Sequence, residues 1–219
     1  MNEIKSKWQT KEIAQTYVEG VRGAIPGANL QLEVISKIVN KWFPLPSKVI
    51  DLGCGDGILG RLLLDEYPTA HIIFADFSEP MLEKLRNRIG SDKRATVVNI
   101  DFATSAWINK MEMEKPFDII VSGFAIHHQS DERKMDLYAE ILGLLSDGGL
   151  FLNLDQVSSV TVSIGKLFDS FFLDHMQRFI KNNRPNITMH EIEEAYYQDK
   201  KENIPAPVER QCQWLRDIG

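Results

Sequence analysis

Residues 49–60 read V-I-D-L-G-C-G-D-G-I-L-G, and this stretch restricts the fold more than any other. A short apolar run ends in Asp51, and four glycines follow within eight residues. Glycine adopts backbone conformations that other residues avoid, and it lets the backbone approach another group closely. A strand that leads through such a loop into a helix is typical of the first unit of a parallel α/β sheet. The stretch therefore predicts a binding loop at the carboxyl end of a first strand.

The rest of the chain alternates strand-like and helix-like segments. Parallel neighbouring strands need helical crossovers, so this alternation predicts an α/β fold with a Rossmann-like, doubly wound, mostly parallel sheet. The fourth predicted strand has an unbroken apolar core, which indicates burial on both faces. The predicted strands are residues 48–52, 71–74, 96–100, 117–122 and 150–154.

Helical segments precede and follow this alternating region. Residues 7–20 and 28–42 are predicted helices, separated by the breaker Ile25-Pro26-Gly27. Three further helices are predicted after the fifth strand, at 158–183, 188–200 and 208–217. The predicted organisation is a helical lid (1–44), a Rossmann-like core (45–156), and a helical cap or insertion with the last helix of the core (157–219).

Composition and charge disfavour several classes of protein. The formal net charge is −6, whereas proteins that bind a nucleic-acid backbone are usually basic, so nucleic acid is not an expected partner. Cys54 and Cys212 do not form a metal-type pair, and two cysteines suit a reducing compartment. The amino terminus lacks a secretory pattern, and no run approaches the ~18 apolar residues of a membrane helix. A cytoplasmic protein without membrane contact is expected.

The glycine loop matches two fingerprints. Gly55, Gly57 and Gly60 satisfy G-x-G-x-x-G, and Asp76 follows Gly55 by 21 residues, as in a nicotinamide-dinucleotide site. Asp51 argues against this interpretation, because an acid aimed into the pocket opposes a pyrophosphate and suits a cationic ligand. An NAD(P)-dependent oxidoreductase remains an alternative at this point.

Two acid–aromatic pairs extend the argument. Asp76 precedes Phe77, so a carboxylate that suits ribose lies beside a ring that could flank a flat base. Asp101 precedes Phe102 at the end of the third predicted strand, where a carboxylate could accept a hydrogen bond from an exocyclic amine. These pairs favour a nucleoside ligand.

The order and spacing of these motifs resemble those of class I S-adenosylmethionine-dependent methyltransferases. The resemblance includes D-L-G-C-G-D-G (51–57), Asp76, Asp101, F-D-I-I-V-S (117–122) and L-L-S-D-G-G-L-F (144–151), and it extends over roughly residues 45–155. It implies S-adenosylmethionine as methyl donor, S-adenosylhomocysteine as product, and a small molecule as acceptor. The residues that the resemblance assigns to the cofactor are Arg22, Asp51, Gly53, Gly55, Gly57, Asp76, Phe77, Met81, Asp101, Phe102 and Ser122.

The segment after the fourth strand narrows the type of acceptor. It reads Ser122-Gly-Phe-Ala-Ile-His127-His128 and lacks the Asn/Asp-Pro-Pro-aromatic turn typical of enzymes that methylate amines of nucleobases. A histidine pair resembles the small-molecule O-, N- or C-methyltransferases, and an imidazole titrates near neutrality, which suits a base. His127 and His128 are therefore candidate catalytic residues, although both could instead cap or pack the turn. Tyr17 and Asp155 are candidate substrate contacts, and no metal site is predicted.

Two features leave the function open. The two strands that normally end the sheet of this family, one of them antiparallel, are missing from the sequence pattern. A protein that binds S-adenosylmethionine without catalysis is therefore an alternative. The predicted helix 158–183 also carries an apolar stripe that suits core packing or a homodimer contact; it comprises Ile164, Leu167, Phe168, Phe171, Phe172, Met176 and Phe179.

Overall fold

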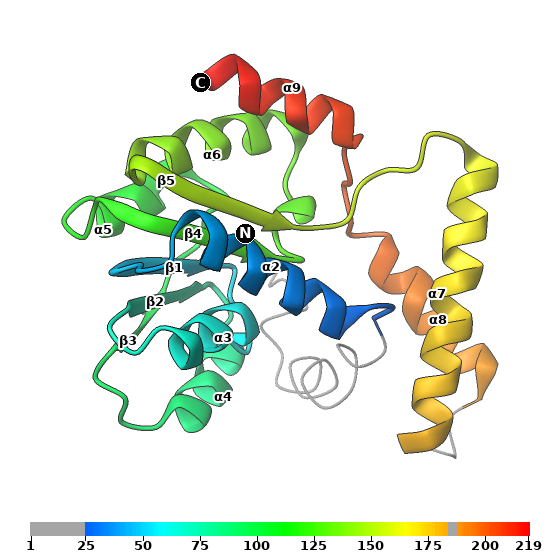
Figure 1. Cartoon of the computed structure of the whole chain (residues 1–219). Coiled ribbons are helices and arrows are strands. Elements are labelled where there is room, and N and C mark those ends of the chain that lie inside the picture. The colour runs from blue at the N-terminus through cyan, green and yellow to red at the C-terminus, as the bar shows by residue number, and fades with distance from the viewer. Residues whose placement is uncertain (1–24, 184–187) are drawn as a thin grey trace, which may run out of the picture.

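A computed structural model describes residues 25–183 and 188–219 of the chain (Figure 1). Its centre is a five-stranded sheet in the order β3-β2-β1-β4-β5, in which every pair of neighbours is parallel. The strands are β1 (Lys48–Leu52), β2 (His71–Asp76), β3 (Ala95–Asn99), β4 (Phe117–Gly123) and β5 (Leu145–Leu154). The chain runs outward from β1 to β3 and then returns to place β4 on the other side of β1. The strand order therefore reverses between β1 and β4, where open parallel sheets commonly bind ligands.

Helices cover both faces of the sheet (Figure 1). On one face lie α2 (Ala28–Trp42), α3 (Ile58–Glu66) and α4 (Glu79–Ile89). On the other face lie α5 (Ile108–Met111), α6 (Asp131–Leu144) and α9 (Val208–Ile218), with the short turn η4 (Ser105–Trp107) before α5. The turn η5 (Ile126–His128) follows β4 at the carboxyl edge of the sheet.

Alternation along the strands builds two separate cores. Ile72 and Phe74 of β2 pack toward α3 and α4, whereas Ile73 and Ala75 pack toward α6. Successive side chains of a strand point to opposite faces, so an apolar run such as that of β2 serves both layers at once. All four side chains are buried. This double burial makes the sheet a fixed platform for the loops at its carboxyl ends.

The helices α7 (Val162–Asn183) and α8 (Met189–Lys200) lie side by side at the carboxyl edge of the sheet (Figure 1). Leu173, Met176 and Ile192 form a small core of their own between the two helices. Tyr196 donates a hydrogen bond from its hydroxyl group to Asp169 over 2.8 Å, which also ties α8 to α7. We call this pair the α7–α8 hairpin.

Residues 201–207 connect α8 to α9, and we call them the strap. The Ile204 amide donates to the His127 carbonyl oxygen over 2.8 Å, and the Ser158 amide donates to the Ala206 carbonyl over 3.1 Å. The buried ammonium group of Lys134 on α6 donates to the Ile204 carbonyl. The strap therefore joins three places in the fold: η5, the segment after β5, and α6.

The predicted fold class is confirmed: the chain is an α/β protein with a Rossmann-like parallel sheet. The prediction for the fifth strand was wrong at its start, because β5 begins at Leu145, which pairs with Phe117 across an irregularity in the register. The predicted helix 7–20 lies outside the described residues. Within the described part of the chain, no helix is long and apolar enough to cross a membrane.

Candidate functional site

A cavity of about 1710 Å³ opens at the carboxyl edge of the sheet. One part of its wall comes from the loops that follow β1, β2 and β3, and another part comes from η5 and the segment after β5. The α7–α8 hairpin and the strap contribute the far wall. The cavity thus lies next to the reversal in strand order and is bounded by segments distant in sequence.

The glycines after β1 are required first by the protein's own packing. Gly53 has φ of 68°, and a Cβ added to it would lie 2.4 Å from the Cβ of Ala125. Gly57 has φ of 80°, and a Cβ there would lie 2.5 Å from Leu85. L-residues with side chains rarely adopt such φ values, so both positions favour glycine for two reasons. Gly53 and Gly55 also line the cavity, whereas Gly57 does not.

Asp51 stabilises the glycine loop from within the protein core. Its side chain is buried, and its carboxylate accepts a hydrogen bond from the Gly60 amide over 2.7 Å. This contact satisfies one of the amides that the start of α3 leaves without an intrahelical partner. Asp51 also lines the cavity, so it places negative charge beneath the loop.

Asp76 lies at the end of β2 and connects two loops. One carboxylate oxygen accepts from the Gly55 amide and the other from the Ser78 amide, each over 2.8 Å. Burial raises the pKa of Asp76, while hydrogen bonds from backbone amides oppose that rise. Each oxygen of a carboxylate has more than one acceptor site, so both can still accept a further hydrogen bond. Phe77 and Met81 line the cavity beside Asp76.

Asp101 and Phe102 form the third part of this wall. Asp101 accepts a hydrogen bond from the Ala103 amide over 2.8 Å, which closes the turn after β3. Arg133 of α6 donates from Nε to the Phe102 carbonyl over 2.8 Å and forms a two-pronged ion pair with Glu140. Sequence reasoning did not identify this arginine, which holds the turn from α6, the helix that shares a core with Phe102.

The residues that end β1, β2 and β3 fit the adenosine part of S-adenosylmethionine. A ribose presents hydroxyl donors, and Asp76 offers two buried carboxylate oxygens with spare acceptor capacity. An adenine is flat and apolar on its faces, and Phe77 and Met81 line the adjacent wall. Asp101 supplies an exposed acceptor in the same cavity.

His127 and Asp155 form a buried pair at the other end of the site. The His127 amide donates to the Asp155 carboxylate over 2.9 Å, and the His127 Nδ1 atom contacts its other oxygen. The two side chains are only 4% and 5% exposed. An ionised carboxylate only accepts, so in the neutral form of the ring Nδ1 carries the proton and Nε2 is the acceptor. His127 lines the cavity, whereas Asp155 lies behind it.

The rings of His128 and His127 lie close together, with centroids 4.1 Å apart and planes tilted by 45°. Burial lowers the pKa of His128, and His127, when it is protonated, lowers that pKa further. His128 lines the cavity as well. Ser122 does not: its buried hydroxyl donates to the Leu52 carbonyl over 2.8 Å and ties β4 to β1.

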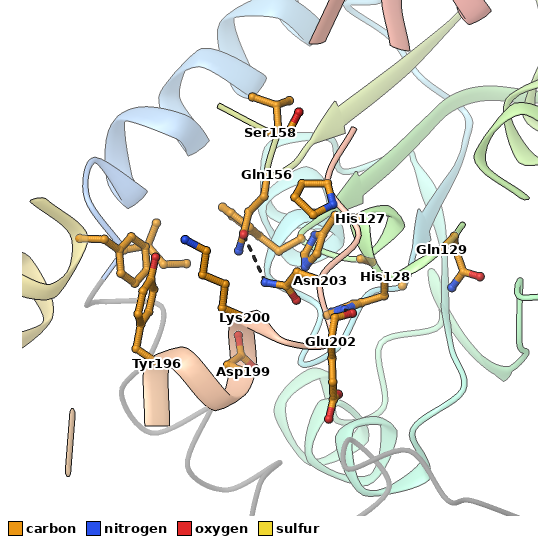
Figure 2. A pocket seen from close by; sticks show the side chains of 18 of the residues that line it. His127, His128, Gln129, Gln156, Ser158, Tyr196, Asp199, Lys200, Glu202 and Asn203 are labelled. Carbon is orange, nitrogen blue, oxygen red and sulfur yellow. Dashed lines mark hydrogen bonds between the residues drawn. The ribbon is translucent and has the colours of Figure 1, made fainter. Parts of the chain in front are cut away.

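Several residues of the far wall were not anticipated from sequence. Figure 2 shows the amide groups of Gln156 and Asn203 meeting between the two histidines and the side chains of Tyr196 and Lys200. The Asn203 amide donates to Gln156 over 3.3 Å, although the two residues are 47 positions apart. No local pattern marks such residues, because only the folded path of the strap brings them to the cavity.

Two predicted residues, Tyr17 and Arg22, lie outside the described residues. Among residues 25–183 and 188–219, no group of three His, Cys, Asp or Glu side chains is arranged to hold a metal ion. The predicted site residues that the structure describes form two groups, one around Gly55 and Asp76 and the other around His127.

Comparison with protein families agrees with this geometry. Residues 50–151 match the family model of a methyltransferase domain. A malonyl-[acyl-carrier protein] O-methyltransferase from Ilyobacter polytropus is 30% identical over 104 residues, which cover 48% of this chain and 37% of that protein. A demethylmenaquinone methyltransferase from Leptospira interrogans is 30% identical over 107 residues, covering 49% and 42% of the two chains. The chain thus matches less than half the length of these curated relatives.

A solved structure extends the similarity to the whole fold. A protein from Methanococcus maripaludis, proposed to be an S-adenosyl-L-methionine-dependent methyltransferase, superimposes with a TM-score of 0.64. The match covers 100% of this chain and 88% of that one at 22% identity, so it supports the fold alone. Residues 50–151 therefore resemble a methyltransferase domain, and the fold of the chain is similar to that of the Methanococcus maripaludis protein.

Proposed function

We propose that this protein transfers a methyl group from S-adenosylmethionine to an oxygen, nitrogen or carbon atom of a small molecule, by in-line displacement. The observation that carries the proposal is a single cavity that both Asp76 and His127 line, with Asp155 bound to His127 behind the cavity wall. One end has the acceptors that a nucleoside needs, and the other has a buried, oriented imidazole. A binding protein without turnover would have no need of the second feature.

The residues around Asp76, which we call the cradle, would hold the donor as follows. Asp76 accepts from the ribose hydroxyls, Phe77 and Met81 flank the adenine, and Asp101 accepts from the adenine amine. Gly53 and Gly55 expose backbone near the methionine part, with Asp51 beneath them. The donor supplies an electrophilic methyl group on a positively charged sulfur.

The protein's remaining task is to prepare the acceptor. In-line displacement requires the attacking atom to be aligned with the methyl group, and water to be kept out. Asp155 fixes the tautomer of His127, so that Nε2 can take a proton from an acceptor that arrives protonated. A positioned base of this kind contributes about 10²–10⁴-fold to a rate.

Isothermal titration calorimetry with S-adenosylhomocysteine and with NAD tests the donor. We expect S-adenosylhomocysteine to bind and NAD to bind far more weakly, because Asp51 disfavours a pyrophosphate beside the loop. Preferential binding of NAD would contradict the proposal and favour an oxidoreductase.

A second measurement separates catalysis from binding alone. The protein is incubated with methyl-labelled donor and a panel of phenols, amines and carboxylic acids, and label in the product is counted. Transfer to at least one acceptor, lost in a His127→Ala variant that still binds S-adenosylhomocysteine, is the expected result. Binding without any transfer would instead identify a non-catalytic S-adenosylmethionine-binding protein.

A further inference from the structure

The first half of α7 presents large apolar side chains to the cavity. Phe168 and Phe171 are 62% and 55% exposed, and Ile164 is 42% exposed. All three line the cavity that also contains the cradle around Asp76. Exposed aromatic residues of this size are unfavourable in water, so a gathering of them in one cavity indicates a surface that becomes covered.

The α8 helix reaches the first half of α7 at Asp169 but leaves these three apolar side chains exposed. The small core between the helices is formed by Leu173 and Met176, in the second half of α7, and by Ile192 of α8. The apolar face therefore continues toward the start of α7 beyond the region that α8 buries. Its exposure follows from the placement of α8 and gives the cavity an apolar wall.

Other parts of the cavity wall contribute apolar side chains as well. Ile25 and Pro26 line the cavity ahead of α2, and Val157, Val160 and Val208 line it from the segments around the strap. Val160 is 83% exposed, and Val157 and Val208 are each 47% exposed. A ligand between these walls and α7 would lose water from apolar surface on several sides.

The end of the cavity nearest η5 is polar. His127, Gln156 and Asn203 meet there, as Figure 2 shows. The Asn203 Oδ1 atom is buried and accepts no hydrogen bond within the described residues, so its capacity to accept one is unused. The cavity therefore has a polar end beside the proposed base and an apolar stretch of wall on α7, where Lys166 and Asp169 also line it.

From this division we propose that the acceptor is an amphiphile. Its polar, methyl-accepting group lies at His127, and its extended apolar body lies along Ile164, Phe168 and Phe171 of α7. This inference rests on the proposed function and adds the chemical class of the substrate. The apolar wall is assigned to the acceptor because it belongs to the same cavity as the donor cradle.

A homologous series of para-alkylphenols, from ethyl to octyl, tests this proposal. Each is titrated by calorimetry into protein saturated with S-adenosylhomocysteine. Burial of one more methylene group strengthens binding by about fourfold, so affinity should rise steadily along the series. If S-adenosylhomocysteine itself does not bind, the proposed function fails; if it binds but alkyl length has no effect, the amphiphile proposal fails.

The α7 helix offers a matched pair of variants. Phe168 lines the cavity, whereas its neighbour Leu167 does not, and the two are similarly exposed at 62% and 66%. Phe168→Ala should weaken octylphenol binding by about tenfold and ethylphenol binding much less, since only the longer chain reaches far along α7. Leu167→Ala should leave both affinities within about twofold of the original protein.

Equal effects of the two variants would overturn the proposal, because they would show that the cavity wall is not what the alkyl chain contacts.

Analytical ultracentrifugation of the same variants tests whether the apolar stripe of α7 is instead a homodimer contact. A dimer of the original protein that Phe168→Ala dissociates would assign the face to a second copy of the chain and overturn the proposal. A monomer in all three proteins supports it.

Discussion

At the scale of single residues, Asp76 has two roles that both need its negative charge, in a buried position that disfavours that charge. It organises the apo site by accepting from the Gly55 and Ser78 amides, and it is the proposed acceptor for the ribose hydroxyls. Both roles use the ionised carboxylate, while burial favours the neutral acid and raises its pKa. Donor binding should therefore depend on the charge of this one group.

The variant Asp76→Asn tests this dependence. The amide group would turn one N–H donor toward a backbone donor, so the dissociation constant for S-adenosylhomocysteine should rise roughly 10–100-fold. Calorimetry at neutral pH gives the constant, and Asp136→Asn, the same change on the exposed side of α6, should leave it unaltered. Equal affinities of the original protein and the Asp76 variant would remove Asp76 from the binding site.

The raised pKa adds a pH dependence with a definite sign. Protonation of Asp76 removes acceptor capacity, so affinity for S-adenosylhomocysteine should fall as the pH drops through the pKa of this group. Because burial raises that pKa, the fall should begin at a higher pH than for an ordinary aspartate. The Asp76→Asn variant should lack this part of the pH profile, which calorimetry over mildly acidic pH can measure.

Asp155 acts on the proposed base rather than on the acceptor. Replacement by Asn would remove the pure acceptor that selects the Nδ1-protonated form of His127. We expect Asp155→Asn to lower kcat by about 10²-fold or more while S-adenosylhomocysteine binds as before. Nitrogen NMR of the imidazole should show a shift toward the other tautomer. Full activity with an altered tautomer would mean that His127 is not the base.

At the scale of elements, the sequence predicted the strands and loops that follow from the local pattern of apolar and acidic residues. The apolar runs of β1 and β4 and the acids at the ends of β1 and β2 can be read without a structure, because each strand is buried on both faces and each loop follows directly. The start of β5 was missed because Leu145 joins the sheet through a register irregularity before Gly148, which a periodicity argument does not detect.

The strap was missed for a different reason. Asn203 and Ile204 lie in a polar connection with no periodicity, and their partners Gln156 and His127 are remote in sequence. Their positions depend on α9 packing beside α6, a tertiary contact that no local signal specifies. The positions of the residues around Asp76 could therefore be predicted from the sequence, whereas those of the strap residues could not.

Lys134 gives a test of how firmly the strap is held. Its side chain is 1% exposed, and its ammonium group donates to the Ile204 carbonyl and to Asp131 over 3.1 Å. Lys134→Met would leave the Ile204 carbonyl without this partner, so the free energy of unfolding should fall by about 1–3 kcal/mol. Urea denaturation measures the loss, and hydrogen exchange at the Ile204 amide should become faster.

The matched control for this variant is Arg210→Ala. Arg210 also pairs with Asp131, over 3.0 Å, but its side chain is 61% exposed. An exposed ion pair contributes little, so the free energy of unfolding should change by less than about 1 kcal/mol. An equal loss of stability in both variants would show that the buried contact of Lys134 stabilises the protein no more than the exposed ion pair of Arg210.

At the scale of the whole molecule, the described chain has two regions that differ in the size of their buried apolar core. The sheet is covered on both faces by helices, and its core side chains are almost fully buried. The α7–α8 hairpin has a small core of its own, and α7 packs chiefly against α8. Regions with few buried apolar contacts open at lower free energy than the main core, so the hairpin should open independently of the sheet.

Hydrogen exchange with mass spectrometry can follow this opening under three conditions. Without ligand, amides of α7 and α8 should exchange faster than those of β1 and β4. In the proposed binding mode S-adenosylhomocysteine contacts the loops after β1, β2 and β3, so it should protect these loops and leave α7 nearly unchanged. Its addition at about 100 times its dissociation constant should stabilise the whole protein by about 2.7 kcal/mol.

Octylphenol added to the complex should then slow exchange in the first half of α7, because the alkyl chain bridges the hairpin and the facing wall. Protection of α7 by S-adenosylhomocysteine alone would contradict this division of the cavity, since the donor would then contact the hairpin directly. The Phe168→Ala variant should lose the octylphenol effect and keep the donor effect. The two ligands would thereby stabilise different regions of one cavity, the donor acting on the sheet and the acceptor on the hairpin.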